Sequence, residues 1–138
     1  MSKTYKAAIA DAMQEAMDCN PHSLIIGQGV TDFKGIFDTM VGFTDKYPNR
    51  IIETPLAEDS VAGICIGAAL NGAYPINTHI RADFGLLIFN QLINLAAKYK
   101  YMFGGLFEIP SMYRMVIGRS WGQGAQHSQS LQSLMAHI

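Results

Sequence analysis

Short apolar runs alternate with helix-length segments along this chain, and this alternation constrains the fold more than any other feature of the sequence. Four runs have the length of strands: LIIGQG (24–29), RIIE (50–53), YPINTHI (74–80) and SMYRMVI (111–117). The first, an apolar run closed by glycines, is typical of a strand buried in a parallel sheet. Strands separated by helices predict parallel strands joined by crossover helices. We therefore expect an α/β fold, a three-layer domain with a mainly parallel sheet flanked by helices.

The segments between these runs have helical patterns. Apolar residues recur at helical spacing in residues 4–18 and 83–100, and a last helix is expected in residues 130–138. Residues 36–49 are expected to be a loop with one short helix, and residues 118–129 a glycine-rich loop.

The most apolar helix is expected at residues 57–71. Thr54-Pro55 is expected to begin it, because proline in a first helical turn loses no donor that the helix needs. The segment is apolar nearly all round, which predicts burial on most of its sides. Gly63 and Gly67 lie one turn apart and would let another backbone approach closely.

Composition excludes several classes of protein. The chain has 138 residues, which suits one domain. Its formal net charge is −1 and no block of Lys or Arg stands out, so nucleic acid is not an expected partner. The longest apolar run is about half the ~20 residues that span a bilayer, and Asp11 and Glu15 interrupt the N-terminal segment where a signal peptide needs an apolar run. We expect no membrane partner.

Two further expectations concern the setting of the chain. Cys65 lies inside the apolar helix and is expected to be a buried, reduced thiol, which favours a cytoplasmic location. The last expected helix is barely two turns long, which is typical of a domain cut from a longer protein. Residues 1–138 are therefore interpreted as one domain that is truncated at its C-terminal end.

Several motifs do not carry the chemistry that they first indicate. The glycines of GQG at 27–29 lack the third glycine of a dinucleotide fingerprint, because that position holds Asp32. Ser128 beside His127 lacks the G-x-S-x-G frame of a nucleophile elbow. No histidine pairs with another ligand at a metal-binding spacing, so no metal site is expected within this chain; the four are His22, His79, His127 and His137.

Two acids, Glu58 and Asp59, stand at the head of the apolar helix. Either one complements the helix dipole, an effect of a few tenths of a kcal/mol. Glu58 differs because its neighbours Leu56, Ala57 and Val61 are apolar, so we expect partial desolvation, which favours the protonated form. A carboxyl group that holds its proton is suited to hydrogen-bonding a heteroaromatic nitrogen.

Three stretches together resemble a known family. ETPLAEDSVAGICIGAALNGAYPI (53–76), ADFGLLIFNQLINLAAKYKYMFGG (82–105) and AQHSQS (125–130) are similar to the pyrimidine-binding domain of thiamine-diphosphate enzymes. The resemblance is strongest to the beta subunit of the decarboxylating component of 2-oxoacid (pyruvate, acetoin or branched-chain) dehydrogenase complexes. It covers essentially the whole chain in order. It implies the transketolase-like pyrimidine-binding fold and oxidative decarboxylation of a 2-oxoacid.

The resemblance implies roles for four residues. The candidate catalytic residues are Glu58, which would hydrogen-bond the ring nitrogen of the cofactor's aminopyrimidine, and His127, which would handle protons or a carboxylate near the reactive carbon. Phe84 would pack on the pyrimidine, and Leu56 would contact it through its backbone. Two plainer interpretations stay open: Phe84 as an ordinary core residue, and His127 as a loop residue with a backbone partner.

The chain departs from the family pattern in ways that imply partners. It has no G-D-G motif followed by an asparagine, so magnesium and the diphosphate are expected on an alpha subunit or diphosphate-binding domain, and the isolated chain is expected to be inactive. Gln28 replaces an acid that the family often has, and loop 114–124 is atypical, so substrate preference does not carry over. A lipoyl carrier component and assembly into a homo- or hetero-oligomer are also implied.

Two other functions remain open at this stage. One is a fragment of a transketolase or a deoxyxylulose-phosphate synthase, which would share the acid. The other is a non-catalytic assembly module that dimerises through the Gly63/Gly67 helix.

Overall fold

The computed structural model describes residues 2–118 and 122–138, which form an α/β domain around one parallel sheet. The four strands follow the spatial order β2-β1-β3-β4. Their bounds are β1 Ser23–Gly27, β2 Ile51–Glu53, β3 Tyr74–His79 and β4 Met112–Met115. All the pairings are parallel, so the predicted fold class is confirmed. The chain passes from β1 outward to β2 and then crosses back to β3 on the other side of β1.

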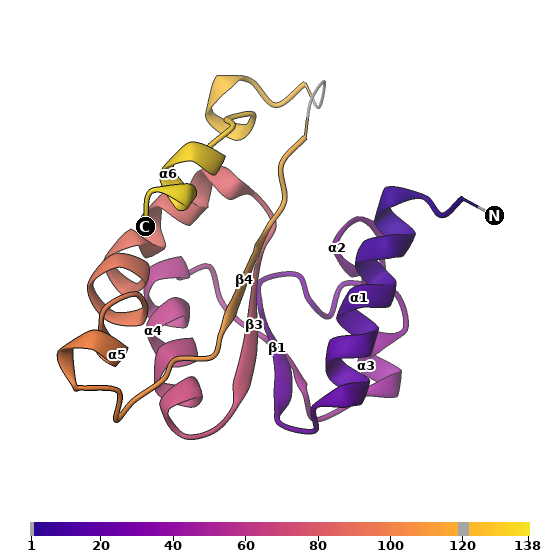
Figure 1. The fold of residues 1–138 in the computed structure, drawn as a ribbon. Coiled ribbons are helices and arrows are strands. Elements are labelled where there is room, and N and C mark those ends of the chain that lie inside the picture. Colours follow the sequence, from indigo (N-terminus) through magenta and orange to yellow (C-terminus); the bar gives the residue numbers. More distant parts are fainter. Residues whose placement is uncertain (1, 119–121) are drawn as a thin grey trace.

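The helices α1, α2 and α3 cover one face of this sheet (Figure 1). Helix α1 (Tyr5–Cys19) begins where the Thr4 hydroxyl accepts a hydrogen bond from the Ala7 amide at 3.3 Å. The segment expected to hold one short helix holds two, α2 (Gly35–Asp38) and α3 (Phe43–Lys46). The buried core on this face consists of Met13, Met17, Ile25, Val30, Ile36, Met40, Phe43, Tyr47, Ile51 and Ile76.

Helix α2 is a left-handed turn. Ile36, Phe37 and Asp38 have φ of 44°, 56° and 60°, and Gly35 before them has φ of 45°. Each non-glycine residue in this region costs about 1–2 kcal/mol. Gly35 is required here for a second reason, because a Cβ would lie 2.6 Å from backbone atoms of the following turn. The surrounding packing therefore holds a strained segment beside the end of β1.

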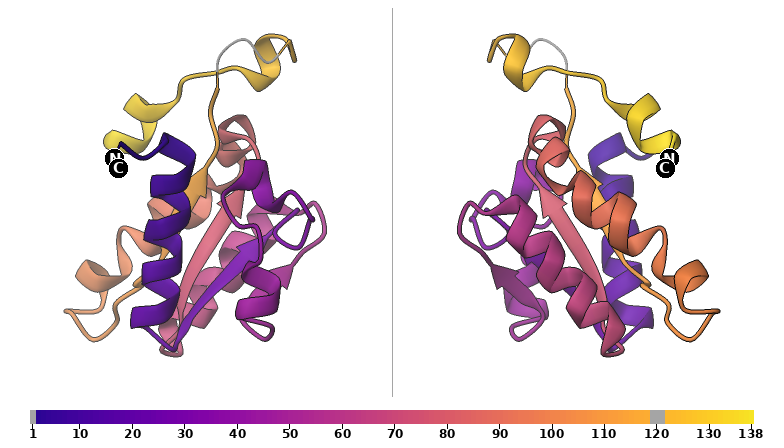
Figure 2. Two further views of the ribbon diagram at one scale, coloured as in Figure 1. Left: turned by 90° about the vertical axis from the view of Figure 1, so that its right-hand side faces the viewer. Right: turned by 90° about the vertical axis from the view of Figure 1, so that its left-hand side faces the viewer.

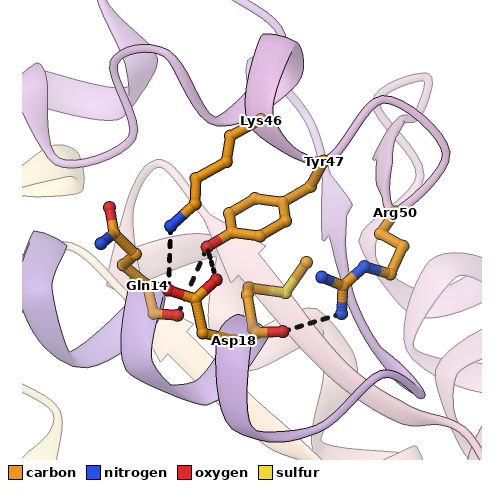
Figure 3. Close-up of polar contacts among 6 residues, drawn as sticks. Gln14, Asp18, Lys46, Tyr47 and Arg50 are labelled. Carbon is orange, nitrogen blue, oxygen red and sulfur yellow. Dashed lines mark hydrogen bonds and ion pairs between the residues drawn. The ribbon is translucent and has the colours of Figure 1, made fainter.

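A polar cluster ties α1 to α3 and β2 (Figure 3). Tyr47 donates a hydrogen bond to the Asp18 carboxylate at 2.6 Å, and Lys46 pairs with the same carboxylate at 2.8 Å. Through Nη1, Arg50 donates to the carbonyl oxygens at the end of α1 and the start of β1, at 2.9 Å to Met17, 3.0 Å to Asn20 and 3.2 Å to Ser23. Arg50 thereby satisfies carbonyl groups that the end of a helix leaves unpaired.

Helix α4 (Glu58–Leu70) covers the other face, beside the segments that follow β3 (Figure 2). Its buried residues are Val61, Ala62, Cys65, Ile66 and Ala69. Gly63, Gly67 and Ala68 are half-buried, whereas Ile64 is 58% exposed and Leu70 38% exposed, so the helix is buried on most sides but not all round. Within the described chain, nothing lies within 4 Å of a Cβ built at Gly63 or Gly67, so the expected close backbone approach is absent.

The two cysteines lie in different environments. Cys65 is fully buried on the side of α4 that packs against Ile26 of β1, and it is free, as expected; burial raises its pKa to about 12. Cys19 is free and exposed at the end of α1.

Residues 83–100 do not form the single helix that was expected. They form a 3-10 helix η1 (Ala82–Ile88), a π-helix η2 (Gln91–Ala96) and a short α-helix α5 (Tyr99–Met102). The backbone between η1 and η2 stays right-handed, with φ −59° and ψ −33° at Phe89. The expected helical path is therefore correct, but the hydrogen-bond register changes twice, which hydrophobic spacing cannot reveal.

The chain then returns through β4 to the end of the sheet where the strands' carboxyl ends lie (Figure 1). There it forms a 3-10 turn, η3 (Ala125–His127), and helix α6 (Gln132–Ala136), within the last expected helix. Residues 119–121 of the expected glycine-rich loop lie outside the described residues. In the described part of the chain, no helix combines the length and the apolar character needed to cross a membrane.

Candidate functional site

A cavity of about 430 Å³ opens at the carboxyl ends of β1, β2 and β3. Strand β1 lies between β2 and β3, so the connections from these strands leave the sheet in opposite directions here. Open parallel sheets commonly bind ligands at such a position. Its wall consists of Gln28, Thr54, Pro55, Leu56, Ala57, Glu58, Val61, Thr78, His79, Ile80, Arg81, Phe84, Gln123 and His127.

The cavity brings together all four residues that were singled out from the sequence. Leu56 comes from the segment between β2 and α4, Glu58 is the first residue of α4, Phe84 comes from η1, and His127 from η3. Three segments far apart in the chain therefore supply one wall.

The segment 54–57 turns the chain from the sheet to the cavity. The Thr54 amide donates to the carbonyl of Gly27 at 3.0 Å, which continues the β1–β2 ladder by one residue. The expectation that Thr54-Pro55 begins the helix is therefore wrong, since Thr54 is held by the sheet and α4 begins at Glu58. The non-helical residues include Leu56, whose side chain is 69% exposed.

Glu58 and Asp59 differ in their surroundings, although they are neighbours at the start of α4. Glu58 is half-buried and lines the cavity, whereas Asp59 is exposed and does not. The expected partial desolvation of Glu58 agrees with this burial. Within residues 2–118 and 122–138, no hydrogen bond engages the Glu58 carboxyl group. That group can therefore serve a molecule in the cavity.

The Phe84 and His127 rings meet edge to face, with centroids 5.4 Å apart and planes at 75°. Asp83, which is buried, accepts a hydrogen bond at 3.0 Å from the Gln129 amide. This bond fastens the loop that carries His127 onto the start of η1. The plainer interpretation of Phe84 as a core residue fits less well, because Phe84 is half-buried and borders the cavity.

His79 is a cavity residue that sequence reasoning missed. Its Nε2 lies 2.8 Å from Oδ1 of Asn77, whose amide nitrogen donates to the carbonyl of Ile26 at 3.2 Å. Burial lowers the pKa of His79, and the negative charge of Glu58 opposes that shift. Thr78, beside it, has a buried hydroxyl without a partner among the described residues. Ligands are expected at the carboxyl ends of parallel strands. The position of Thr78 and His79 at the end of a predicted strand could therefore have identified both residues from the sequence.

Arg81 was also missed and supplies positive charge at the cavity wall. Its Nε and Nη2 donate to Oε1 of Gln123 at 2.9 and 2.7 Å, and its guanidinium lies 5.3 Å from the ring centroid of Phe37. Burial lowers the pKa of Arg81, and the charge of Asp83 opposes that shift. The strained turn of α2 is thereby linked to the cavity.

The loop after β1 is fixed by Glu53 at the end of β2. Its carboxylate accepts from the Gly29 amide at 2.6 Å, and from the amide and hydroxyl of Thr31 at 2.9 and 3.0 Å. These bonds hold the loop that places Gln28 at the cavity wall. No group of three or more His, Cys, Asp or Glu side chains gathers as metal ligands in the described residues.

The fold and this site define a class of protein. The family model described as the transketolase pyrimidine binding domain matches residues 1–138. The chain belongs to that family.

The similar proteins agree with the resemblance found in the sequence. The rice (Oryza sativa subsp. japonica) mitochondrial pyruvate dehydrogenase E1 component subunit beta-2 is 34% identical over 136 residues, covering 98% of this chain and 36% of the relative. The pyruvate dehydrogenase E1 component subunit beta of Chaetosphaeridium globosum is 40% identical over 132 residues, covering 95% and 40%. The acetoin:2,6-dichlorophenolindophenol oxidoreductase subunit beta of Cupriavidus necator is 34% identical over 143 residues, covering 96% and 42%. The chain thus spans well under half the length of these relatives.

Proposed function

We propose that this chain is the pyrimidine-binding half of a thiamine-diphosphate site that oxidatively decarboxylates a 2-oxoacid. The observation that carries the proposal is that Glu58, Phe84 and His127 wall one cavity at the switch point of the sheet. The relatives support it, because those compared above are beta subunits of pyruvate dehydrogenase or of an acetoin oxidoreductase.

The residues present fit the aminopyrimidine end of the cofactor. A carboxyl group without a partner in the described chain suits a ring nitrogen, and an aromatic ring suits packing on a flat heterocycle. When bound, thiamine diphosphate supplies an electron sink for carbanion chemistry. We place magnesium and the diphosphate on the partner domain.

Each of this chain's own residues then has a task. Glu58 exchanges a proton with the ring nitrogen of the pyrimidine, at the position where the family has its acid. Phe84 packs on the ring and orients it. His127, in contact with Phe84, handles a proton or the substrate carboxylate, as an imidazole can. Leu56 contacts the pyrimidine through its backbone and limits access of water.

The proposal includes partners. An alpha subunit or diphosphate-binding domain completes the site, a lipoyl carrier component receives the product, and the chain works in an oligomer. We retain a cytoplasmic location as part of the proposal, on the strength of the two free cysteines. The relatives favour this function over a transketolase-type fragment or a non-catalytic module.

Reconstitution tests the proposal. The chain is co-expressed with a G-D-G-bearing alpha-type chain from the same genome, and reduction of dichlorophenolindophenol is measured with thiamine diphosphate, magnesium and pyruvate, branched-chain 2-oxoacids or acetoin. We expect reduction with at least one substrate, and none when this chain is omitted. A stable complex that reduces the dye with none of them contradicts the proposal.

A further inference from the structure

The left-handed turn of α2 places Phe37 against a residue of the cavity wall. Ile36, Phe37 and Asp38 all have positive φ, a conformation that β-branched and aromatic residues rarely adopt. Ile36 is 5% exposed and belongs to the core, whereas Phe37 is 47% exposed and its ring centroid lies 5.3 Å from the guanidinium group of Arg81. Arg81 is part of the cavity wall. Strained backbone of this kind persists where the surrounding structure holds it, and it is concentrated at functional sites.

The Thr39 hydroxyl closes this turn. Thr39 is 4% exposed, and its Oγ1 donates to the carbonyl of Ile36 at 2.7 Å. The same oxygen accepts a hydrogen bond from Nη2 of Arg114 in β4 at 2.6 Å. Because a guanidinium group only donates and a carbonyl only accepts, the direction of both bonds is fixed. Arg114 therefore orients the proton of the Thr39 hydroxyl toward the Ile36 carbonyl.

Arg114 is an unfavourable residue for packing alone. Its Nη1 is buried without a hydrogen-bond partner among the described residues, and no carboxylate in that part of the chain pairs with this guanidinium group. A buried charge without an opposite charge destabilises a fold. An apolar side chain would avoid this cost, but it would supply no donor to the Thr39 hydroxyl. A strained turn and an unpaired buried cation thus meet at Thr39, and such joint departures from local rules are expected at functional or strained sites.

We propose that Arg114 is a positioning residue of the cavity wall. Through the Thr39 hydroxyl it holds α2 in the left-handed conformation, and this turn holds Phe37 against Arg81. Gln123 also accepts hydrogen bonds from Arg81, so loss of the turn should shift the guanidinium group without releasing it. This role goes beyond the proposed function, because it concerns the shape of the wall whatever molecule the cavity binds.

The test uses NMR of the 15N-labelled chain without any ligand. Positive φ gives strong intraresidue contacts between amide and Hα protons, and these should mark the turn in the wild-type chain together with contacts between the Phe37 ring and the Arg81 side chain. Thr39→Val keeps the shape of the side chain and removes the hydroxyl, and Arg114→Met removes the donor. Both should lose the two sets of contacts and shift the Nε–H signal of Arg81. Thr39→Ser keeps the hydroxyl and should retain them.

The double variant Thr39→Val/Arg114→Met should give the same contacts as Thr39→Val alone, because both side chains act through one hydroxyl. A purely structural role would instead lower the melting temperature and leave the contacts of the folded chain unchanged. Contacts that persist in Thr39→Val, or that are lost there and persist in Arg114→Met, overturn the proposal.

Should Arg114→Met fail to fold, the guanidinium protons of Arg114 decide. Their exchange with water should be slow in the wild-type chain and in Thr39→Ser, and fast in Thr39→Val. Equal exchange in the wild-type chain and Thr39→Val overturns the proposal. None of these results depends on the reconstitution that tests the proposed function, so the two can fail separately.

Discussion

The rings of Phe84 and His127 meet edge to face at 5.4 Å, and this contact joins the segment after β3 to the loop after β4. The two residues stand on elements that the bond from Gln129 to Asp83 already holds together. The aromatic contact therefore sets where the imidazole lies against the cavity.

Phe84→Leu tests this contact. Leucine keeps an apolar side chain but has no ring to meet His127, and aromatic pairs contribute about 0.5–1.5 kcal/mol beyond burial. We expect a loss of stability of that size in urea unfolding, together with a shifted and broadened imidazole signal of His127. Phe107→Leu is the control, since Phe107 meets Phe103 edge to face in an exposed segment and its replacement should leave His127 unchanged. An unchanged His127 signal in Phe84→Leu would contradict the account.

Substitution of glycine by alanine should have opposite effects on stability at Gly27 and at Gly63. A Cβ at Gly27 would lie 2.2 Å from the carbonyl oxygen of Thr78, so Gly27→Ala must push β1 and β3 apart beside the cavity. We expect a loss of about 3 kcal/mol or more, the upper range for single substitutions. At Gly63, inside α4, nothing lies within 4 Å of an added Cβ. Because alanine favours a helix more than glycine does, Gly63→Ala should stabilise the chain by up to about 1 kcal/mol. Thermal melting compares the two, and equal melting temperatures would refute the packing described here.

The polar cluster at the end of α1 yields a third prediction (Figure 3). Arg50→Met removes three hydrogen bonds to carbonyl oxygens, of which that of Asn20 keeps the Ser23 amide as a donor. The loss should be about 2–3 kcal/mol, because hydrogen bonds to charged groups are among the stronger ones. Lys46→Met removes an exposed ion pair with Asp18 and should cost at most about 1 kcal/mol. Urea denaturation checks the order, and a larger loss in Lys46→Met would contradict it.

Burial of His79 predicts how stability depends on pH. Its pKa in the folded chain lies below the ordinary value of 6.5, so the unfolded chain binds a proton more readily. Stability should therefore fall as the pH drops through 6.5 toward the folded value, and level off below that value. The lowered pKa values of Asp18 and Asp38 act only at more acidic pH, below roughly 4.

His79→Gln is the variant that isolates this effect. Urea unfolding at about pH 7.5 and about pH 5.5 brackets the range in which histidine changes charge. The variant should lose less stability than the wild-type chain between the two. An equal loss in both would mean that His79 is not the group responsible.

The structure places Glu58 and His127 at the wall of one cavity. Both stand in local motifs, T-P-x-x-E and Q-H-S-Q, which can be recognised without knowing the rest of the fold, and their chemical roles stay predictions. His79 stands in no such motif. Its place at the end of a strand pointed to the cavity, but its surroundings depend on which face of β3 it occupies and on Ile26 in the neighbouring strand, and both follow from the sheet order. A lone histidine in an apolar strand gives no such information.

The departures from the predicted elements have a similar origin. The left-handed turn at Ile36, Phe37 and Asp38 contradicts the local preference of those residues, and only tertiary packing stabilises it. The helix expected at 57–71 begins at Glu58, and Thr54-Pro55 is not part of it because the Thr54 amide continues the ladder with Gly27. The spacing of hydrophobic residues predicts neither the packing around the left-handed turn nor the hydrogen bond between Thr54 and Gly27.

The central claim is that Glu58 performs proton chemistry, and one comparison of variants tests it most directly. In the reconstituted complex, turnover and melting temperature are measured for Glu58→Gln and Asp59→Asn. Glutamine keeps the shape and can hydrogen-bond but cannot exchange the proton, so turnover should fall about 10²–10⁴-fold with little change in melting. Asp59→Asn removes a neighbouring, exposed charge and should stay within about threefold, because a charge at a helix start contributes only a small dipole effect. Equal turnover in the two variants, or a collapse of melting in Glu58→Gln, would contradict the claim.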